Sequence, residues 1–134
     1  QHQVVLTFVN PVTATGVTVT SHDGGAGAAT HTISGNVIAV DMTGVTDQHN
    51  YVVTLNNVND GVNMGNVAIP MGILLGDTNA DRFVNSGDAL QTRNRSGQMT
   101  NATTFRSDVN IDGFVNSGDT LAVRNRSGTF LPYA

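Results

Sequence analysis

The sequence predicts two modules of different class, an all-β module over residues 1–75 and a small all-α module over residues 76–134. Three observations lead to this division. Residues 1–75 contain short runs rich in Val and Thr, separated by Gly and Asn. All Arg residues of the chain fall after residue 75. The second module also contains an internal repeat of 21 residues, which predicts two copies of one structural unit.

Six runs in the first module predict β-strands, because each combines alternating apolar residues with turn-forming residues at its ends. We expect strands at residues 4–9, 17–20, 31–34, 37–42, 51–55 and 67–69. In the run 51–55, the two-residue period of a strand places Tyr51, Val53 and Leu55 on one face, which should be the core side. Six short strands at this spacing predict a β-sandwich.

Residues 42–66 (MTGVTDQHNYVVTLNNVNDGVNMGN) resemble the end of bacterial surface Ig-like domains, where a strand led by Tyr precedes a turn of the form V-x-D…G-N. The resemblance implies an Ig-like fold for the sandwich. Residues 70–76 (PMGILLG) are predicted to link the two modules. The segment 129–134 is apolar, and we expect Phe130, Leu131 and Tyr133 to pack against the linker at residues 73–75.

The internal repeat aligns residues 77–97 (DTNADRFVNSGDALQTRNRSG) with residues 108–128 (DVNIDGFVNSGDTLAVRNRSG), and 15 of the 21 positions are identical. Side chains with oxygen atoms recur at positions 1, 3, 5, 9 and 12 of each copy. These side chains are Asp77, Asn79, Asp81, Asn85 and Asp88 in the first copy, and Asp108, Asn110, Asp112, Asn116 and Asp119 in the second. The spacing is that of an EF-hand-type loop, in which six to eight oxygen atoms surround Ca²⁺.

The position of the acidic residues supports two calcium sites. All six acidic residues after residue 75 occupy positions 1, 5 or 12 of the loops, whereas Asp and Asn gathered merely by turn propensity would not repeat in this way. Position 7, Phe83 or Phe114, should contribute its backbone carbonyl. Position 8, Val84 or Val115, should join the two loops through a short β contact.

Position 6 distinguishes the two loops. It normally requires a left-handed turn, and it is Gly113 in the second loop but Arg82 in the first. A residue other than Gly costs about 1 kcal/mol in that conformation. The second site is therefore expected to bind calcium more tightly than the first.

Two short loops with Asp at position 12, each followed by one helix, resemble a dockerin over residues 76–131. The resemblance implies a secreted bacterial module with main helices at 88–96 and 119–127 and a linking helix at 101–107. It also implies a cohesin partner, contacted through loop positions 10 and 11 and through the helices, where Arg93 and Arg124 lie at equivalent positions.

Composition excludes several other functions. The acidic residues are all Asp, the basic residues are all Arg, and the net charge of -4 gives no general attraction to nucleic acid. No apolar run is long enough for a membrane span. The chain lacks Glu, Cys and a Gly-x-Ser-x-Gly motif, and its four His show no metal-ligand spacing, so we expect no enzyme. Asn94, Asn101 and Asn125 begin N-x-S/T triplets, which are glycan acceptor sequences.

Two hypotheses of function follow. The first is a non-enzymatic, extracellular or cell-surface structural protein that calcium stabilises and that assembles with copies of itself into a fibre or another surface assembly. The alternative is a dockerin appendage that docks a secreted enzyme onto a cohesin-bearing scaffold.

Overall fold

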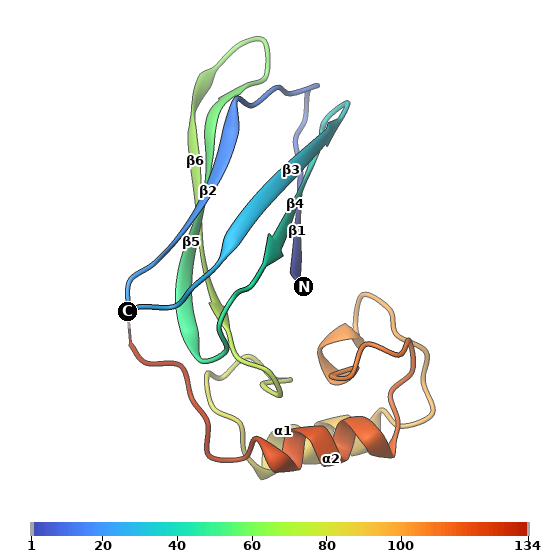
Figure 1. Ribbon diagram of the computed structural model, residues 1–134. Helices are drawn as coiled ribbons and strands as arrows, with labels where there is room; N and C mark the ends of the chain where they lie inside the picture. Colours follow the sequence, from blue (N-terminus) through green and yellow to red (C-terminus); the bar gives the residue numbers. More distant parts are fainter. Residues whose placement is uncertain (1, 134) are drawn as a thin grey trace. The chain divides into compact units, whose positions relative to one another are not determined.

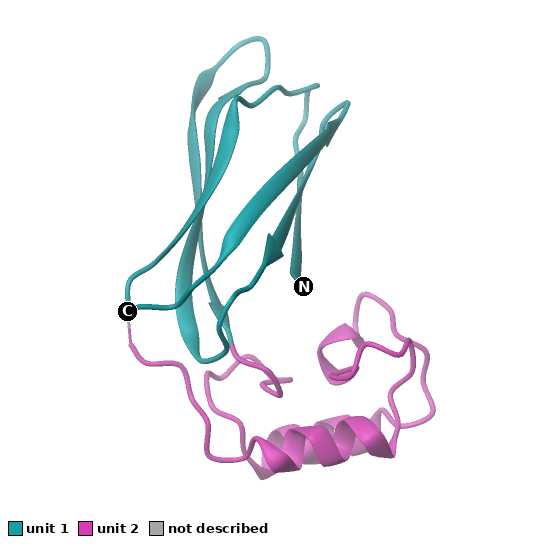
Figure 2. Ribbon diagram, viewed as in Figure 1, with its two compact units in different colours: residues 1–73, 134 teal, residues 74–133 magenta. Residues whose placement is uncertain are grey.

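The computed structural model describes residues 2–133 (Figure 1). These residues form two compact units (Figure 2). The first unit extends to Ile73, and the second covers Leu74–Tyr133. No helix in the described part of the chain is both long and apolar enough to cross a membrane.

The first unit consists of two three-stranded antiparallel sheets, so the predicted β-sandwich is confirmed (Figure 1). The strand order is β1-β4-β3 in one sheet and β2-β5-β6 in the other. The strands are β1 (His2–Thr7), β2 (Gly16–Ser21), β3 (Ala28–Ser34), β4 (Val37–Thr43), β5 (His49–Asn59) and β6 (Met64–Ile73).

All six predicted strands are present, but each has bounds that differ from the predicted ones. β1 ends at Thr7, and Val9 lies outside it with 96% of its surface exposed. β6 continues to Ile73, so residues 70–73 of the predicted linker belong to a strand. Pro70 is tolerated there because β6 is an edge strand, where a missing backbone N–H breaks no interior ladder.

The core of this unit contains residues of β4 and β5, the central strands of the two sheets. Tyr51, Val53 and Leu55 of β5 are buried, which confirms the predicted face. On β4, the alternate residues Ile38, Val40 and Met42 are also fully buried, and this pattern follows from the two-residue period of a strand with one side facing the core.

The hydroxyl group of Tyr51 joins two loops of the sandwich. It donates a hydrogen bond to the Ala26 carbonyl (2.8 Å) and accepts one from the Thr46 N–H (2.7 Å). A Cβ atom at Gly25 would lie 2.5 Å from this hydroxyl oxygen, so only Gly fits there without displacing a neighbour.

Asp23 joins the β2–β3 loop to the start of β5. Its carboxylate accepts hydrogen bonds from the Ser21 hydroxyl (2.6 Å), His49 Nδ1 (2.8 Å) and the Asn50 backbone N–H (3.1 Å). These donors, the Ser21 hydroxyl first, hold the pKa of Asp23 well below its usual range.

The second unit contains α1 (Ser86–Asn94), a 3₁₀ helix (Phe105–Ser107) and α2 (Ser117–Asn125). The two main helices begin two residues before the predicted start, because Asn85 and Asn116 act as N-caps with a capping box. The predicted linking helix at 101–107 is reduced to a single 3₁₀ turn. The Asn101 side chain accepts the Thr103 N–H (2.8 Å), which favours a turn in place of a first helical turn.

The two repeats pair reciprocally. In the first loop, Val84 N–H donates to the Thr129 carbonyl (2.9 Å), and the Val84 carbonyl accepts the Gly128 N–H (2.8 Å). In the second, Val115 makes the equivalent bonds with Gln98 (2.9 Å) and Gly97 (2.8 Å). Position 8 of each loop therefore pairs with the segment that follows the helix of the other repeat. The expected direct pairing of Val84 with Val115 is wrong, because both backbone groups of each residue already have these partners.

Candidate metal centre

The two loops share one backbone conformation. Residues at positions 4 and 6 have positive φ in both, namely Ala80 (64°) and Arg82 (74°) in the first, and Ile111 (60°) and Gly113 (91°) in the second. Arg82 thus adopts the left-handed conformation that the sequence predicts for position 6. Position 4 was not predicted, because Ala and Ile give no indication of a left-handed residue.

Position 12 closes each loop onto its helix. Asp119 is fully buried; its Oδ1 accepts the N–H groups of Val109 (2.8 Å) and Asn110 (3.2 Å), and its Oδ2 accepts that of Asn116 (2.8 Å). Asp88 is equally buried and makes the equivalent three bonds in the first loop. The backbone thereby approaches the short Asp side chain, which replaces the longer Glu of an ordinary EF-hand.

Position 1 organises the turn at positions 5 and 6. Asp108 accepts the N–H groups of Asp112 (3.1 Å) and Gly113 (3.0 Å). In the first loop Asp77 accepts the corresponding bonds from Asp81 (3.2 Å) and Arg82 (3.0 Å). Every candidate carboxylate at position 1 or 12 is therefore fixed by backbone donors before any ion is considered.

Three carboxylates converge in the second loop. Oxygen atoms of Asp108, Asp112 and Asp119 all lie within 4.8 Å of one another, and no Arg or His of residues 2–133 forms an ion pair with them. Hydrogen bonds, the Phe114 N–H first, lower the pKa of Asp112 and favour its charged form. A cluster of hard, negatively charged oxygen atoms without a cationic partner fits a divalent cation. Within the described residues, the first loop brings no such group of three together.

Two Asn side chains lie beside the carboxylates of the second loop. Asn110 and Asn116 direct their Nδ2 groups at Asp112 Oδ2 (3.0 and 3.1 Å). Their Oδ1 atoms accept the backbone N–H groups of Asp112 (3.0 Å) and Gly118 (2.7 Å), respectively. The carbonyl groups of Phe83 and Phe114 at position 7 accept no hydrogen bond from residues 2–133 and are open to a cation.

The chain was compared with known protein families. The dockerin type I domain family matches residues 75–126. These residues form a dockerin type I domain. The dockerin resemblance seen in the sequence is thereby confirmed, and the dockerin module is a calcium-binding, extracellular module. No catalytic domain is identified, and no curated protein and no solved structure was found to match the chain.

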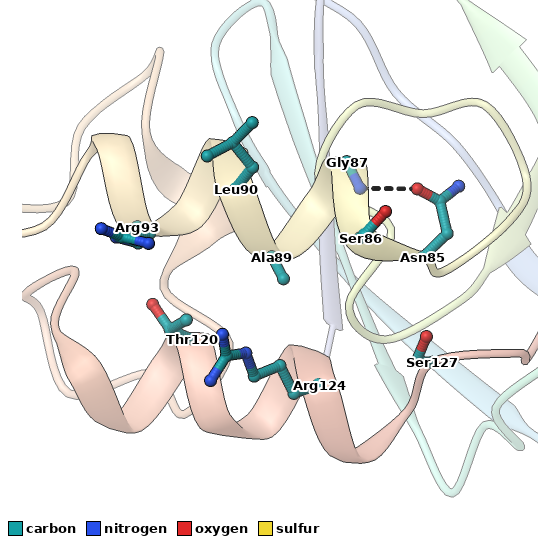
Figure 3. A pocket seen from close by; sticks show the side chains of 9 residues that line it. All are labelled: Asn85, Ser86, Gly87, Ala89, Leu90, Arg93, Thr120, Arg124 and Ser127. Carbon is teal, nitrogen blue, oxygen red and sulfur yellow. Dashed lines mark hydrogen bonds between the residues drawn. The ribbon is translucent and has the colours of Figure 1, made fainter.

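A groove runs between the two helices of the dockerin module (Figure 3). Thr120 and Arg124 of α2 point into it toward Ala89 of α1, and Ser86 and Gly87, in the first turn of α1, line one end (Figure 3). Of the loop positions that the dockerin resemblance assigns to partner contact, those of the first repeat, Ser86 and Gly87, therefore lie at this groove.

Two cations of the groove have no internal partner. Arg93 and Arg124 are exposed, and their side chains form no hydrogen bond or ion pair with residues 2–133. Leu90 and Leu121, the large apolar residues of the helices, are 54% and 57% exposed. The helices thus keep their longest side chains on the surface and bury small ones, such as Thr92 and Val123.

Proposed function

We propose that the dockerin module binds a cohesin and thereby docks this chain onto a cohesin-bearing partner. The observation that supports this function is the match of residues 75–126 to the dockerin type I domain. The groove between α1 and α2 supports the assignment of the contact face, since its two Arg side chains are exposed and have no internal partner.

We further propose two calcium ions, one in each loop. The first would be held by Asp77, Asn79, Asp81, the Phe83 carbonyl, Asn85 and Asp88, and the second by Asp108, Asn110, Asp112, the Phe114 carbonyl, Asn116 and Asp119. Calcium would compensate the charge of these carboxylates, which the fold already holds close together in the second loop, and the stability of the folded loops would rise with the logarithm of its free concentration. Its role is structural, because the groove that would meet the partner is formed by the helices.

We also propose that the chain consists of two domains, residues 1–75 and residues 76–134. The first domain would act as a spacer or a second binding module beside the dockerin module. The dockerin match favours docking over the fibre-forming role, for which no finding on residues 2–133 gives specific support. Sedimentation of the full chain at rising concentration tests self-assembly separately.

The docking function can be tested with the full chain and a panel of recombinant type I cohesin modules. Binding measured by calorimetry should appear in calcium and disappear when EGTA removes it. The double variant Arg93→Glu and Arg124→Glu should lose binding by at least about tenfold, since both cations lie in the groove.

The matched control is Arg106→Glu, because Arg106 is exposed but lies outside the groove on the 3₁₀ turn, above the Phe105 ring. Arg106→Glu changes the net charge by the same amount as each of the two groove substitutions, and this variant should retain cohesin binding. Absence of binding to every cohesin by a folded, calcium-loaded chain would refute the docking function. If the double variant and Arg106→Glu lost equal amounts of binding affinity, the groove would not be part of the contact face.

A further inference from the structure

Each loop of the dockerin module is held against the segment that leaves the helix of the other repeat. We call residues 128–133 and 97–101 the exit segments of α2 and α1. Beyond the pairing of Val84 and Val115, one more backbone bond repeats in both copies. Leu131 N–H donates to the Arg82 carbonyl (3.0 Å), and Thr100 N–H donates to the Gly113 carbonyl (2.9 Å). The backbone arrangement of the two junctions is therefore equivalent.

The side chains at the two junctions differ. In the first, the Arg82 guanidinium donates to the Pro132 carbonyl and lies over the Tyr133 ring, 5.6 Å from its centroid. The Phe83 and Phe130 rings stack beside it, with centroids 6.1 Å apart. This apolar segment thus contacts the first loop, and its packing on the linker at residues 73–75 stays a prediction.

The second junction has no guanidinium, because Gly113 occupies the position equivalent to Arg82. Its exit segment is held by Thr100, whose hydroxyl donates a short hydrogen bond to Asp108 Oδ2 (2.6 Å). The residue equivalent to Thr100 in the first junction is Leu131, which has no hydroxyl and is buried. Each junction therefore contains one polar side-chain contact that the other cannot make.

The backbone of Arg82 links this contact to the loop. Its N–H donates to Asp77 Oδ2 (3.0 Å), its carbonyl accepts from Leu131, and its φ of 74° is unfavourable for a side chain other than Gly. A Gly at this position would remove the strain but also the contact with Pro132 and Tyr133. The Arg82 side chain therefore offers the exit segment contacts that Gly could not provide at this strained position.

We propose that Arg82 and Thr100 are positioning residues that couple each calcium loop to the exit segment paired with it, Arg82 at the junction of the first loop and Thr100 at the junction of the second. The inference rests on the proposal that both loops hold calcium. Because coupling between two sites is reciprocal, calcium in a loop must order its exit segment by the same factor by which the ordered segment tightens calcium. The two loops use different contacts for this coupling, so each can be weakened alone.

Two variants of the full chain test this assignment and serve as controls for each other. Arg82→Asn removes the guanidinium while keeping a residue that tolerates left-handed φ, and Thr100→Val removes the hydroxyl at nearly constant volume. Amide hydrogen exchange by NMR reports on each junction through the N–H groups of Leu131 and Thr100. Calcium titration followed by the amide signals of Gly113 and residue 82 reports on each loop.

In calcium, Arg82→Asn should accelerate exchange at Leu131 by about tenfold and weaken calcium binding to the first loop by a similar factor, with the second loop unchanged. Thr100→Val should instead accelerate exchange at residue 100 and weaken calcium binding to the second loop, with the first loop unchanged. Arg82→Lys should restore part of the effect, because an ammonium group can reach one acceptor but lacks the planar fork. Arg106→Asn controls for the lost charge and should change neither junction.

Equal effects of both variants on both loops, or no change in exchange at Leu131 in Arg82→Asn, would overturn the assignment. The wild-type titration distinguishes this failure from that of the calcium proposal. If the wild type binds no calcium in either loop, both are overturned. If calcium binds in both loops and exchange at each junction is insensitive to calcium, only the coupling is overturned. Retained amide spectra of the sandwich residues show that each variant is folded.

Discussion

Asp119 offers the sharpest test of how the second loop is built. We predict that Asp119→Ala destabilises the dockerin module far more than Asp112→Ala, although both changes remove one proposed calcium ligand. Asp119 is fully buried and accepts three backbone N–H groups. Asp112 is exposed and accepts one backbone N–H group, from Phe114, besides two amide side chains that can turn to water. Each variant loses one proposed ligand. The difference between their free energies of unfolding therefore measures the cost of leaving backbone N–H groups without an acceptor.

The magnitude follows from those donors. Of the three that Asp119 binds, Asn110 N belongs to an exposed residue and can find water, whereas Val109 N and Asn116 N belong to half-buried residues. An unpaired buried donor costs about 1–3 kcal/mol, and partial exposure favours the lower part of that range. Asp119→Ala should therefore cost about 2–3 kcal/mol more than Asp112→Ala. For a unit of this size the difference corresponds to about 10–20 °C in Tm.

Thermal unfolding in saturating calcium, followed by the amide signals of the dockerin module, is the appropriate assay. Asp88→Ala in the first loop should have an effect at least as large, because Asp88 is equally buried and accepts the equivalent three backbone N–H groups and also the Thr78 hydroxyl. A difference below about 0.5 kcal/mol between Asp119→Ala and Asp112→Ala would refute the reasoning, since surface substitutions alone produce that much.

Three further predictions concern the sandwich, whose unfolding can be followed through the methyl signals of Val53. Because the folded pKa of Asp23 is depressed, its stabilisation is complete above the ordinary pKa of about 3.9 and is lost as the pH falls toward the lower folded value, so Asp23→Asn should flatten the loss of stability below about pH 4. An unchanged pH profile in urea titrations would contradict this. Tyr51→Phe removes the hydrogen bonds of the hydroxyl group with the Thr46 N–H and the Ala26 carbonyl and should cost about 1–2 kcal/mol in urea unfolding, and an unchanged midpoint would be inconsistent with these bonds. Gly25→Ala should cost about 1–3 kcal/mol in the same assay, because the new Cβ would overlap the Tyr51 hydroxyl; a neutral result would show that the loop gives way.

The sequence was sufficient to predict the features that depend on local patterns. The strand face of Tyr51, Val53 and Leu55 follows from a two-residue period, and the left-handed Arg82 follows from the loop register. The helix starts were predicted two residues late, although Asn85 with Asp88 three residues on is itself a capping-box pattern that gives the observed start.

The features that sequence reasoning missed depend on residues far apart in the chain. The pairing of Val84 with residues 128 and 129, in place of Val115, depends on how the two repeats fold around each other. The hydrogen bond from Thr100 to Asp108 spans only eight residues, but no spacing rule connects these positions. The side chains of Asp23, His49 and Tyr51, which join loops of the sandwich by hydrogen bonds, likewise follow no local sequence pattern.

The central claim is that the C-terminal unit is a dockerin module built on two calcium loops. Counting bound calcium on the full chain by native mass spectrometry, together with calorimetric titration of the calcium-free protein, tests it most directly. We predict two ions for each wild-type chain and one ion for the Asp119→Ala chain, whose first loop is unchanged. One ion or none bound to the wild-type chain at saturating calcium would contradict the two-site account.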